Sequence, residues 1–521
     1  MDKGFKQGPR VLIVTPEAAY LPYTQDQSFK VSGARAGGLA DLSACLLHSL
    51  HDRRVDVHVA IPDYRNVFGR NTFFTESGGR RRRYERLPAA NIHLAKDRCF
   101  FYQPRLSGLP VAGNIKIALA FQREIINRII PEVQPDLIHC FDWMTGLLPA
   151  AVRDYGIPCL FTLYNLNSAK ATLAAIEDRG IDAASFWQNC YFDQMPGRYE
   201  DIRDTNPVDF LTSGIFASRA VNMVSKALSR YVLSEKENGL APELRSEIRN
   251  KHAAGCLHAF DHTPGPTFDP AADRFLCQRY TPANHPLGKA MNKLCIQDKL
   301  HLPLDSTAPL FFWPTRLDSL RSGCALIFET LPIILKRFRP CNPQFIFIAD
   351  GDLREDIDVW TRESNAAHRV VASEFNLGLQ HLAYAAADFV LIPVGFEPSG
   401  WPCKISQRYG ALPIAHGAGA IQDAVVHLGG IGDLGNGFVF RNLDATGLIW
   451  AVGEAMAFFQ KPAAVKAAHL QRIMTERLTR DDKTKTLDQY ITLYENLLQR
   501  PLISGGSRAI HHPDLVLQTA A

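Results

Sequence analysis

Short apolar segments alternate with amphipathic ones along the first half of the chain. VLIVTPE (11–17) is a β-branched run of the kind found in strands that are covered on both faces. The stretch 37–50 carries apolar residues at helical spacing, and VDVHVAIP (55–62) has the pattern of a second strand. Further strands are expected at 135–141, 159–165 and 220–225. This alternation predicts βαβ units and therefore a parallel sheet.

The same alternation restarts after Gly255, with expected strands at 309–315, 344–350, 368–373, 388–394 and 412–416. Near the C-terminus, residues 485–500 place their apolar side chains on one helical face. The sequence thus predicts an α/β protein with two Rossmann-like parallel-sheet domains facing a cleft. We expect the first domain at residues 1–253, the second at 254–485, and a helix with a loosely ordered tail at 486–521.

Length and charge limit the classes of function. A chain of 521 residues that is 46% apolar can bury more than one core. The net charge of +4 is small, so we expect no nucleic-acid partner, and the four arginines at 80–83 are interpreted as a solvated loop. No stretch resembles a signal peptide or is long enough to cross a bilayer, which predicts a soluble, cytoplasmic protein without a membrane partner. The eleven cysteines show no metal-site spacing and are expected to be reduced thiols.

Two stretches at strand ends could bind an anion. In RAGGLADL (35–42), Arg35 precedes Gly37 and Gly38, which open a helix whose N-terminus favours an anion. In WPTRLDSLRSG (313–323), Arg316 and Arg321 could neutralise a diphosphate. A plain turn and a surface ion pair are the respective alternatives.

The stretch GFEPSGWPCK (395–404) places Glu397 between an apolar strand and the start of a helix. Its carboxylate could contact a ligand at the mouth of the strand or complement the helix N-terminus. ADGD (349–352) is similar to a metal-binding Asp-x-Asp, but we interpret these acidic residues as belonging to a helix start.

Taken in order, PEAAY, ARAGGLADLSACLLHSL, PDLIHCFDWMTGLLPA, GCLHAFD, TRLDSLRSG and AAADFVLIPVGFEPSG resemble the bacterial glycogen synthases and plant starch synthases. The resemblance implies a retaining glucosyltransferase of the GT-B type, with two Rossmann domains. It also implies a nucleotide-sugar donor, usually ADP-glucose with UDP-glucose as the other candidate, and an α-1,4-glucan acceptor extended at its non-reducing end. No metal or other cofactor is expected, and the C-terminal helix is expected to cross back to the first domain.

The resemblance also assigns roles to residues. Glu397 matches the glutamate that lies against the donor glucose, and Ser399 and Gly400 match positions whose N–H groups hold sugar hydroxyls. Arg316 and Arg321 match the cations on the leaving diphosphate. The remaining positions implied to bind substrate are Arg35, Gly37, Gly38, Asp142, Tyr164, Asn165 and His258.

Several residues depart from the family pattern at this site. Arginine replaces lysine at 35 and 321, and tyrosine replaces histidine at 164. The other departures are Phe141, Met144, His258, Ser399, Pro402, Ala418 and Ala420. Two hypotheses follow. The first is a working glucosyltransferase, which we favour because the charged residues of the site keep their type. The second is a non-catalytic relative that binds glucan or nucleotide sugar, or that regulates an active synthase. A hydrolase is disfavoured because no second opposed carboxylate is evident.

Overall fold

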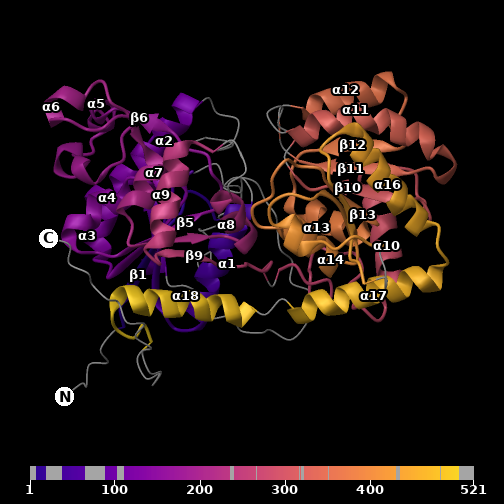
Figure 1. Cartoon of the computed structure of the whole chain (residues 1–521). Coiled ribbons are helices and arrows are strands. Elements are labelled where there is room, and N and C mark those ends of the chain that lie inside the picture. The colour runs from indigo at the N-terminus through magenta and orange to yellow at the C-terminus, as the bar shows by residue number, and fades with distance from the viewer. Residues whose placement is uncertain are drawn as a thin grey trace, which may run out of the picture.

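The computed structural model describes residues 8–18, 38–64, 89–101, 111–234, 240–265, 267–315, 317, 322–349, 351, 353–429, 434–480 and 483–503. Within these residues the chain forms two parallel sheets, which lie in separate halves of the molecule (Figure 1). The two halves stand side by side, and two C-terminal helices run beneath both of them.

Seven described strands form the sheet of the first half, in the order β3-β2-β1-β4-β5-β8-β9. Most of the side chains of β1, β4 and β5 are buried, because helices cover both faces of the sheet. The strands are β1 (Arg10–Val14), β2 (Asp56–Pro62), β3 (Ile92–Ala95), β4 (Leu137–Phe141), β5 (Cys159–Leu163), β8 (Ala220–Met223) and β9 (Leu257–Ala259). A separate antiparallel pair consists of β6 (Lys170–Ala171) and β7 (Val208–Asp209).

The sheet of the second half has six described strands in the order β12-β11-β10-β13-β14-β15. The order therefore reverses between β10 and β13, as it does between β1 and β4 in the first sheet. This is the Rossmann strand order, in which ligands bind at the carboxyl ends of the strands beside the reversal. The strands are β10 (Leu310–Trp313), β11 (Gln344–Ile348), β12 (Val370–Ser373), β13 (Phe389–Ile392), β14 (Leu412–His416) and β15 (Phe438–Phe440).

Short polar side chains cap the N-termini of several helices. Ser225, Asn376 and Asp444 each accept a hydrogen bond from the backbone N–H three residues later, at the starts of α8, α13 and α16. The first half contains α1 (Gly38–Asp52), α2 (Val111–Glu124), α3 (Ile130–Val133), α4 (Leu148–Val152), α5 (Leu173–Glu177), α6 (Tyr199–Ile202), α7 (Phe210–Ala217), α8 (Lys226–Leu233) and α9 (Pro242–Ala253). The remainder are α10 (His285–Lys299), α11 (Ser322–Arg337), α12 (Arg354–Glu363), α13 (Leu377–Ala386), α14 (Trp401–Arg408), α15 (Ile421–Ala424), α16 (Ala445–Phe459), α17 (Ala463–Arg480) and α18 (Lys483–Leu498).

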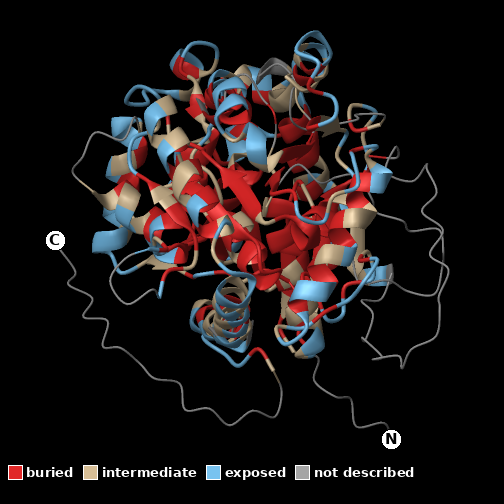
Figure 2. Ribbon diagram, turned by 90° about the vertical axis from the view of Figure 1, so that its right-hand side faces the viewer, coloured by how far each residue is buried: buried red, intermediate tan, exposed pale blue. Residues whose placement is uncertain are grey.

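Burial follows this layered arrangement, with buried strands inside and exposed helix faces outside (Figure 2). Every strand expected from the sequence is present. The strands that the sequence did not predict in the two main sheets are β3, β9 and β15, which have four, three and three residues and lie at sheet edges. Such short segments carry too little periodicity to be recognised, and their pairing depends on a neighbouring strand. In the described part of the chain, no helix combines the length and the apolar composition that a membrane crossing requires.

The C-terminal helices connect the two halves. Helix α17 packs against α14 of the second half, whereas α18 contacts α1 and β4 of the first (Figure 1). Residues 486–498 therefore return to the first half, as the family resemblance implies. The expected division at 253 and 254 falls before β9, and β9 pairs with β8 in the first sheet. The first sheet therefore extends past that position.

Helix α18 is held to the first sheet by buried hydrogen bonds. The Tyr490 hydroxyl lies 2.9 Å from His262 Nε2 and accepts a bond from Asn222 Nδ2. The Tyr494 hydroxyl lies 2.7 Å from Nδ1 of the buried His139. His262 Nδ1 faces the carbonyl oxygen of Val224, which can only accept, so the neutral ring is protonated at Nδ1 and its Nε2 accepts from Tyr490.

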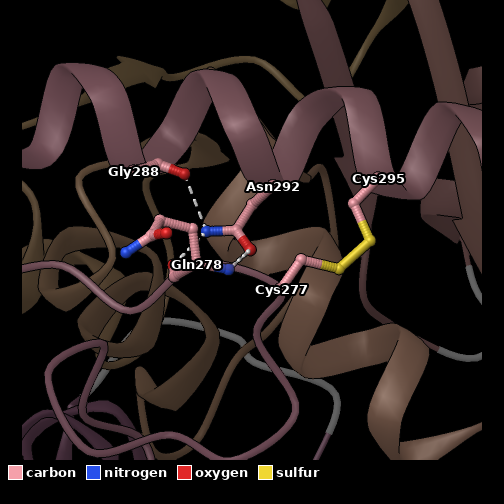
Figure 3. The surroundings of a disulfide bond; sticks show 5 residues. All are labelled: Cys277, Gln278, Gly288, Asn292 and Cys295. Atoms are coloured by element: carbon pink, nitrogen blue, oxygen red, sulfur yellow. Dashed lines mark hydrogen bonds between the residues drawn. A yellow bond between two sulfur atoms is a disulfide. The ribbon is translucent and has the colours of Figure 1, made fainter.

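One pair of cysteines contradicts the expectation of reduced thiols. Cys277 and Cys295 form a disulfide between the loop before α10 and α10 itself (Figure 3). The same loop is held by Asn292, whose side chain bonds both the N–H and the carbonyl of Gln278. The two cysteines are 18 positions apart in the sequence, so short-range spacing did not reveal the pair. The fold brings their Cα atoms to 6.6 Å. The other nine cysteines, all within the described residues, are not part of a disulfide.

Candidate active site

The candidate site lies where the strand order reverses in each sheet. Asp142 directly follows β4 in the first half, and Glu397 follows β13 in the second. Gly38 begins α1, the helix after β1. Because carboxyl ends of parallel strands beside a reversal form a crevice, these topologies place the three residues at the two facing crevices.

Glu397 is bound by its own loop through one carboxylate oxygen. Its Oε1 accepts hydrogen bonds from the Ser399 hydroxyl at 2.7 Å and from the N–H groups of Ser399 and Gly400 at 3.1 and 3.2 Å. Gly400 has φ of +67°, a left-handed conformation that favours glycine and lets the loop fold back over the carboxylate. Oε2 of this half-buried side chain takes part in none of these three bonds. The bonds to Oε1 support the alternative in which Glu397 complements the helix start, and contact with a ligand stays a prediction.

A hydrogen-bonded chain crosses from the first half to Glu397. The Tyr164 hydroxyl lies 3.3 Å from Ser399 Oγ. Ser399 has one hydroxyl proton, which the 2.7 Å contact assigns to Glu397, so Tyr164 donates to Ser399. The order of donation is therefore Tyr164 to Ser399 to Glu397. This chain depends on the two substitutions from the family pattern, at 164 and 399.

Gly38 makes room for the Tyr164 ring. A Cβ atom built on Gly38 would overlap the Tyr164 hydroxyl and lie 2.9 Å from its ring carbon Cζ. Only glycine allows the helix start and the phenol to approach this closely. The long side chain at 164 thus fills space between the start of α1 and the Glu397 loop.

Asp142 holds the loop that carries Tyr164 and Asn165. Its Oδ1 accepts from the N–H groups of Tyr164 at 2.7 Å and Asn165 at 3.3 Å, and its Oδ2 accepts from Asn165 Nδ2 at 2.7 Å. Asp142 itself has φ of +57°, which is strained for a residue with a side chain. Burial raises the pKa of its carboxyl to about 7, against the lowering effect of the two N–H groups. The buried carboxyl group of Asp142 therefore holds this loop in position.

The surroundings of Tyr164 are acidic. Burial, and after it the negative charge of Glu397, raises the pKa of the Tyr164 phenol, and Asp41 and Asp142 act in the same direction. Asp41 is a buried residue in the first turn of α1. Asp41 was not among the site residues predicted from the sequence, although it follows the glycine pair in RAGGLADL (35–42). The phenol stays protonated and can donate.

Further contacts between the halves surround Glu397. The Ser225 hydroxyl donates to the Pro398 carbonyl at 2.6 Å, and the ring of Tyr231 lies 4.4 Å from that of Phe396. Arg230 forms an ion pair with Asp423, at 2.5 and 2.6 Å to its two oxygens. The first half contributes three side chains to these contacts. Arg230 and Tyr231 lie on α8, and Ser225 caps its N-terminus. No local pattern in the sequence indicated them, because the contacts join residues more than 160 positions apart.

The starch synthase catalytic domain is the family whose model matches residues 10–246. Glycogen synthase from Geobacillus stearothermophilus is 26% identical over 501 residues, covering 90% of this chain and 96% of that protein. Glycogen synthase from Clostridium novyi is 27% identical over 490 residues, covering 89% and 97%.

The chain is similar to the glycogen synthases and starch synthases over most of its length. Among solved structures, the catalytic domain of starch synthase IV from Arabidopsis thaliana, bound to ADP and acarbose, superposes with a TM-score of 0.74 at 20% identity. The alignment covers 95% of this chain and 100% of that one. The fold is therefore that of the GT-B glycosyltransferases, as the sequence predicted.

The site residues that the family resemblance implies fall into three groups. Glu397, Ser399, Gly38 and Tyr164 lie together, and Gly400, Asp142 and Asn165 join them through hydrogen bonds. His258 lies in β9, in register with Asn222, whose side chain bonds α18. Within the described residues, no hydrogen bond or ring contact links His258 to Glu397 or Tyr164. Arg35, Gly37, Arg316 and Arg321 lie outside the described residues, as do Asp350 and Asp352 of the Asp-x-Asp stretch.

The substituted loop after β14 supports the Glu397 loop. The Ala420 N–H donates to the carbonyl oxygen of Glu397 at 2.8 Å. A side chain on Gly419, which has φ of +61°, would overlap that same carbonyl. Glycine at 419 and the small residue at 420 thus let the two loops lie in contact.

Proposed function

We propose that this protein is a retaining glucosyltransferase that moves glucose from a nucleotide sugar to the non-reducing end of an α-1,4-glucan. The observation that carries the proposal is the Glu397 carboxylate. It is fixed through one oxygen at the carboxyl end of β13, and the Asp142–Tyr164 loop of the other half approaches it through Ser399. A donor bound in the second half and an acceptor bound against the first would meet there.

In this proposal Glu397 stabilises the positive charge that develops at the anomeric carbon of the donor. The bond from that carbon to the diphosphate breaks, and its electron pair leaves with the diphosphate. Arg316 and Arg321 would neutralise the departing charge, together with Arg35 and the N–H groups beside Gly37 and Gly38. The acceptor hydroxyl forms the new bond, and its proton passes to the leaving diphosphate.

Tyr164 narrows the space beside the donor glucose. Its ring lies between Gly38 and Ser399, and its protonated hydroxyl points toward the Glu397 loop. We propose that it limits the position of the sugar that Glu397 contacts. ADP-glucose is the first candidate donor because the family usually takes it, and UDP-glucose is the second.

The test is turnover of the two donors. Purified protein is mixed with ADP-glucose or UDP-glucose and maltooligosaccharides, and both diphosphate release and glucan lengthening are followed. Lengthening with one donor, unaffected by a metal chelator, is the expected result. No release with either donor from folded protein would reject the proposal. Glucan or nucleotide-sugar binding without turnover would instead favour the non-catalytic hypothesis.

A further inference from the structure

His416 ends β14, and its ring lies between the two strands that flank β14 in the second sheet. Its Nδ1 is 3.1 Å from the carbonyl oxygen of Val394, which follows β13. Its Nε2 is 3.1 Å from the carbonyl oxygen of Arg441, which follows β15. Neighbouring strands lie about 4.8 Å apart, so β13 and β15 are separated by roughly 10 Å. The imidazole ring therefore spans this gap where β14 ends.

Both partners of the ring can only accept a hydrogen bond. A neutral imidazole has one N–H donor and one acceptor nitrogen, whereas the protonated ring donates from both nitrogens. In the neutral form, one nitrogen lone pair would therefore face a carbonyl oxygen at 3.1 Å. The bridge from Val394 to Arg441 is thus complete only when the His416 ring carries both protons. The positive charge then strengthens each of the two bonds.

The bridge is attached to the segment that carries Glu397. Val394 lies three residues before Glu397, between β13 and α14. On the other side of His416, the loop after β14 reaches the same segment, because the Ala420 N–H donates to the Glu397 carbonyl oxygen at 2.8 Å. The backbone around Glu397 is therefore supported both by the His416 ring and by the loop that follows it.

The surroundings of the ring leave its two polar contacts in control. His416 is half-buried, so solvent protons can reach it, and the Phe440 ring lies 5.7 Å away between centroids. The charged and titratable side chains on the segments around it are Glu397 after β13, Asp423 on α15, and His427, Arg441 and Asp444 beside β15. Asp423 pairs with Arg230, and Asp444 caps α16. Among the residues that the structure describes, none of these five side chains is hydrogen-bonded or ion-paired to the His416 ring.

We propose that His416 is a positioning residue for the Glu397 segment, and that its second ring proton switches this role on. With both protons, the ring joins Val394 to Arg441 and holds the segment in place. Loss of one proton as the pH rises breaks one of the two bonds and loosens the segment. This inference rests on the proposed function for the reaction that it affects, but the bridge itself can be tested without a donor.

The first measurement therefore needs no activity. Protein labelled with ¹⁵N-histidine is titrated by NMR from about pH 5.5 to about pH 9, and the His416 signals are identified by their loss in His416→Gln. Hydrogen exchange of residues 394–400 and 417–420 is compared between wild type and His416→Gln over the same range. We expect roughly ten-fold greater protection in the wild type while the ring carries both protons, and equal protection once it has lost one. The proposal is overturned if the ring does not change its protonation in this range, or if protection does not follow that change.

Turnover tests the same role in the reaction. His416→Arg keeps a cation with N–H donors on separate nitrogens throughout this pH range. Relative to this variant, the wild-type kcat should fall roughly ten-fold as the ring loses its second proton. The KM for the glucan should not change, because the acceptor is proposed to bind against the first half. If His416→Arg does not fold, His416→Gln serves as the reference that does not titrate.

The control is His252→Gln, which changes an exposed histidine on α9 of the first half and should follow the wild type at every pH. A kcat ratio that stays constant while the His416 ring titrates would overturn its role in the reaction. A folded protein that turns over neither donor would reject the proposed glucosyltransferase, and the exchange measurement would still decide whether the bridge exists.

Discussion

Glu397 uses its two carboxylate oxygens differently, and this separates its structural role from its proposed chemical one. Oε1 accepts three bonds from residues 399 and 400, which complement the start of α14. Glutamine at 397 would keep an acceptor for these N–H groups but lose the charge. Stability and activity should therefore respond differently to the same substitution.

We expect Glu397→Gln to fold normally and to lose turnover by on the order of 10²–10³, the effect of removing one preorganised charge stabiliser. Diphosphate release at saturating donor measures the loss, and circular dichroism checks the fold. Glu363→Ala, at an exposed carboxylate on α12, is the matched control and should retain activity. Near wild-type turnover in Glu397→Gln would remove this residue from its proposed role.

Gly38 and Tyr164 are so close together that a side chain at position 38 would collide with the tyrosine. Gly38→Ala places a methyl group where the Tyr164 hydroxyl lies and should lower the free energy of unfolding by about 1–3 kcal/mol. Adding Tyr164→Ala removes the obstacle, so the double variant should cost less than the sum of the single ones. Urea denaturation of the four proteins measures this coupling. Additive losses would contradict a direct contact.

At the scale of elements, α18 is attached through neutral histidines. Burial lowers the pKa of His262 to about 4 and that of His139 well below its ordinary value of 6.5. Between pH 4 and pH 6.5, these two histidines bind protons in the unfolded chain but stay neutral in the folded chain. Protonated His262 would also lose the acceptor that Tyr490 uses.

The contribution of these histidines to the free energy of unfolding should therefore be fully present above pH 6.5. It should decline as the pH falls toward 4. Urea midpoints measured across this range test the expectation. His262→Gln removes one titrating group and should flatten the decline, whereas His368→Gln, in the segment just before β12 of the other half, should not. An unchanged decline in His262→Gln would mean that other groups cause it.

The disulfide acts at the same scale by connecting α10 to the loop before it. With its cysteines 18 positions apart in the sequence, it should contribute about 3 kcal/mol by restricting the unfolded chain. Cys277 is exposed, so a thiol reductant should reach it. We expect reductant to lower the urea midpoint of the wild type but not of a Cys277→Ser, Cys295→Ser double variant. Equal sensitivity of the two proteins, or none in either, would contradict the expectation.

At the scale of the whole molecule, the halves meet near Glu397 through a few polar contacts. The Arg230–Asp423 pair has side chains that are 58% and 46% exposed, so its contribution to stability should be below about 1 kcal/mol. We expect the ion pair instead to affect how closely the two halves of the molecule approach each other. Arg230→Ala should increase the radius of gyration measured by X-ray scattering without changing the urea midpoint. Arg198→Ala breaks a pair with Asp201 within the first half and should leave the radius unchanged.

Much of the architecture could be predicted from the sequence because it depends on local patterns. The β-branched runs at 11–17 and 388–394 indicated buried parallel strands, and Glu397 stood out because it follows one of them. The edge strands β9 and β15 were missed, since their pairing depends on β8 and β14. The disulfide was missed for a similar reason, because each cysteine needs a partner that spacing along the chain does not indicate.

By itself, the sequence determined the alternation of strands and helices, and with it the expectation of two Rossmann-like sheets with Asp142 and Glu397 at strand ends. The strand orders, and the reversals beside which these residues lie, came from the structure. Periodicity and strand-end chemistry are local, so they can be read without a fold. Only the tertiary structure decided that Tyr164 donates to Ser399, and that His258 lies in register with Asn222. It also decided that His416 lies between the carbonyl groups of Val394 and Arg441. These relations depend on how separate strands and helices pack, and on which donors and acceptors are left to pair once they do.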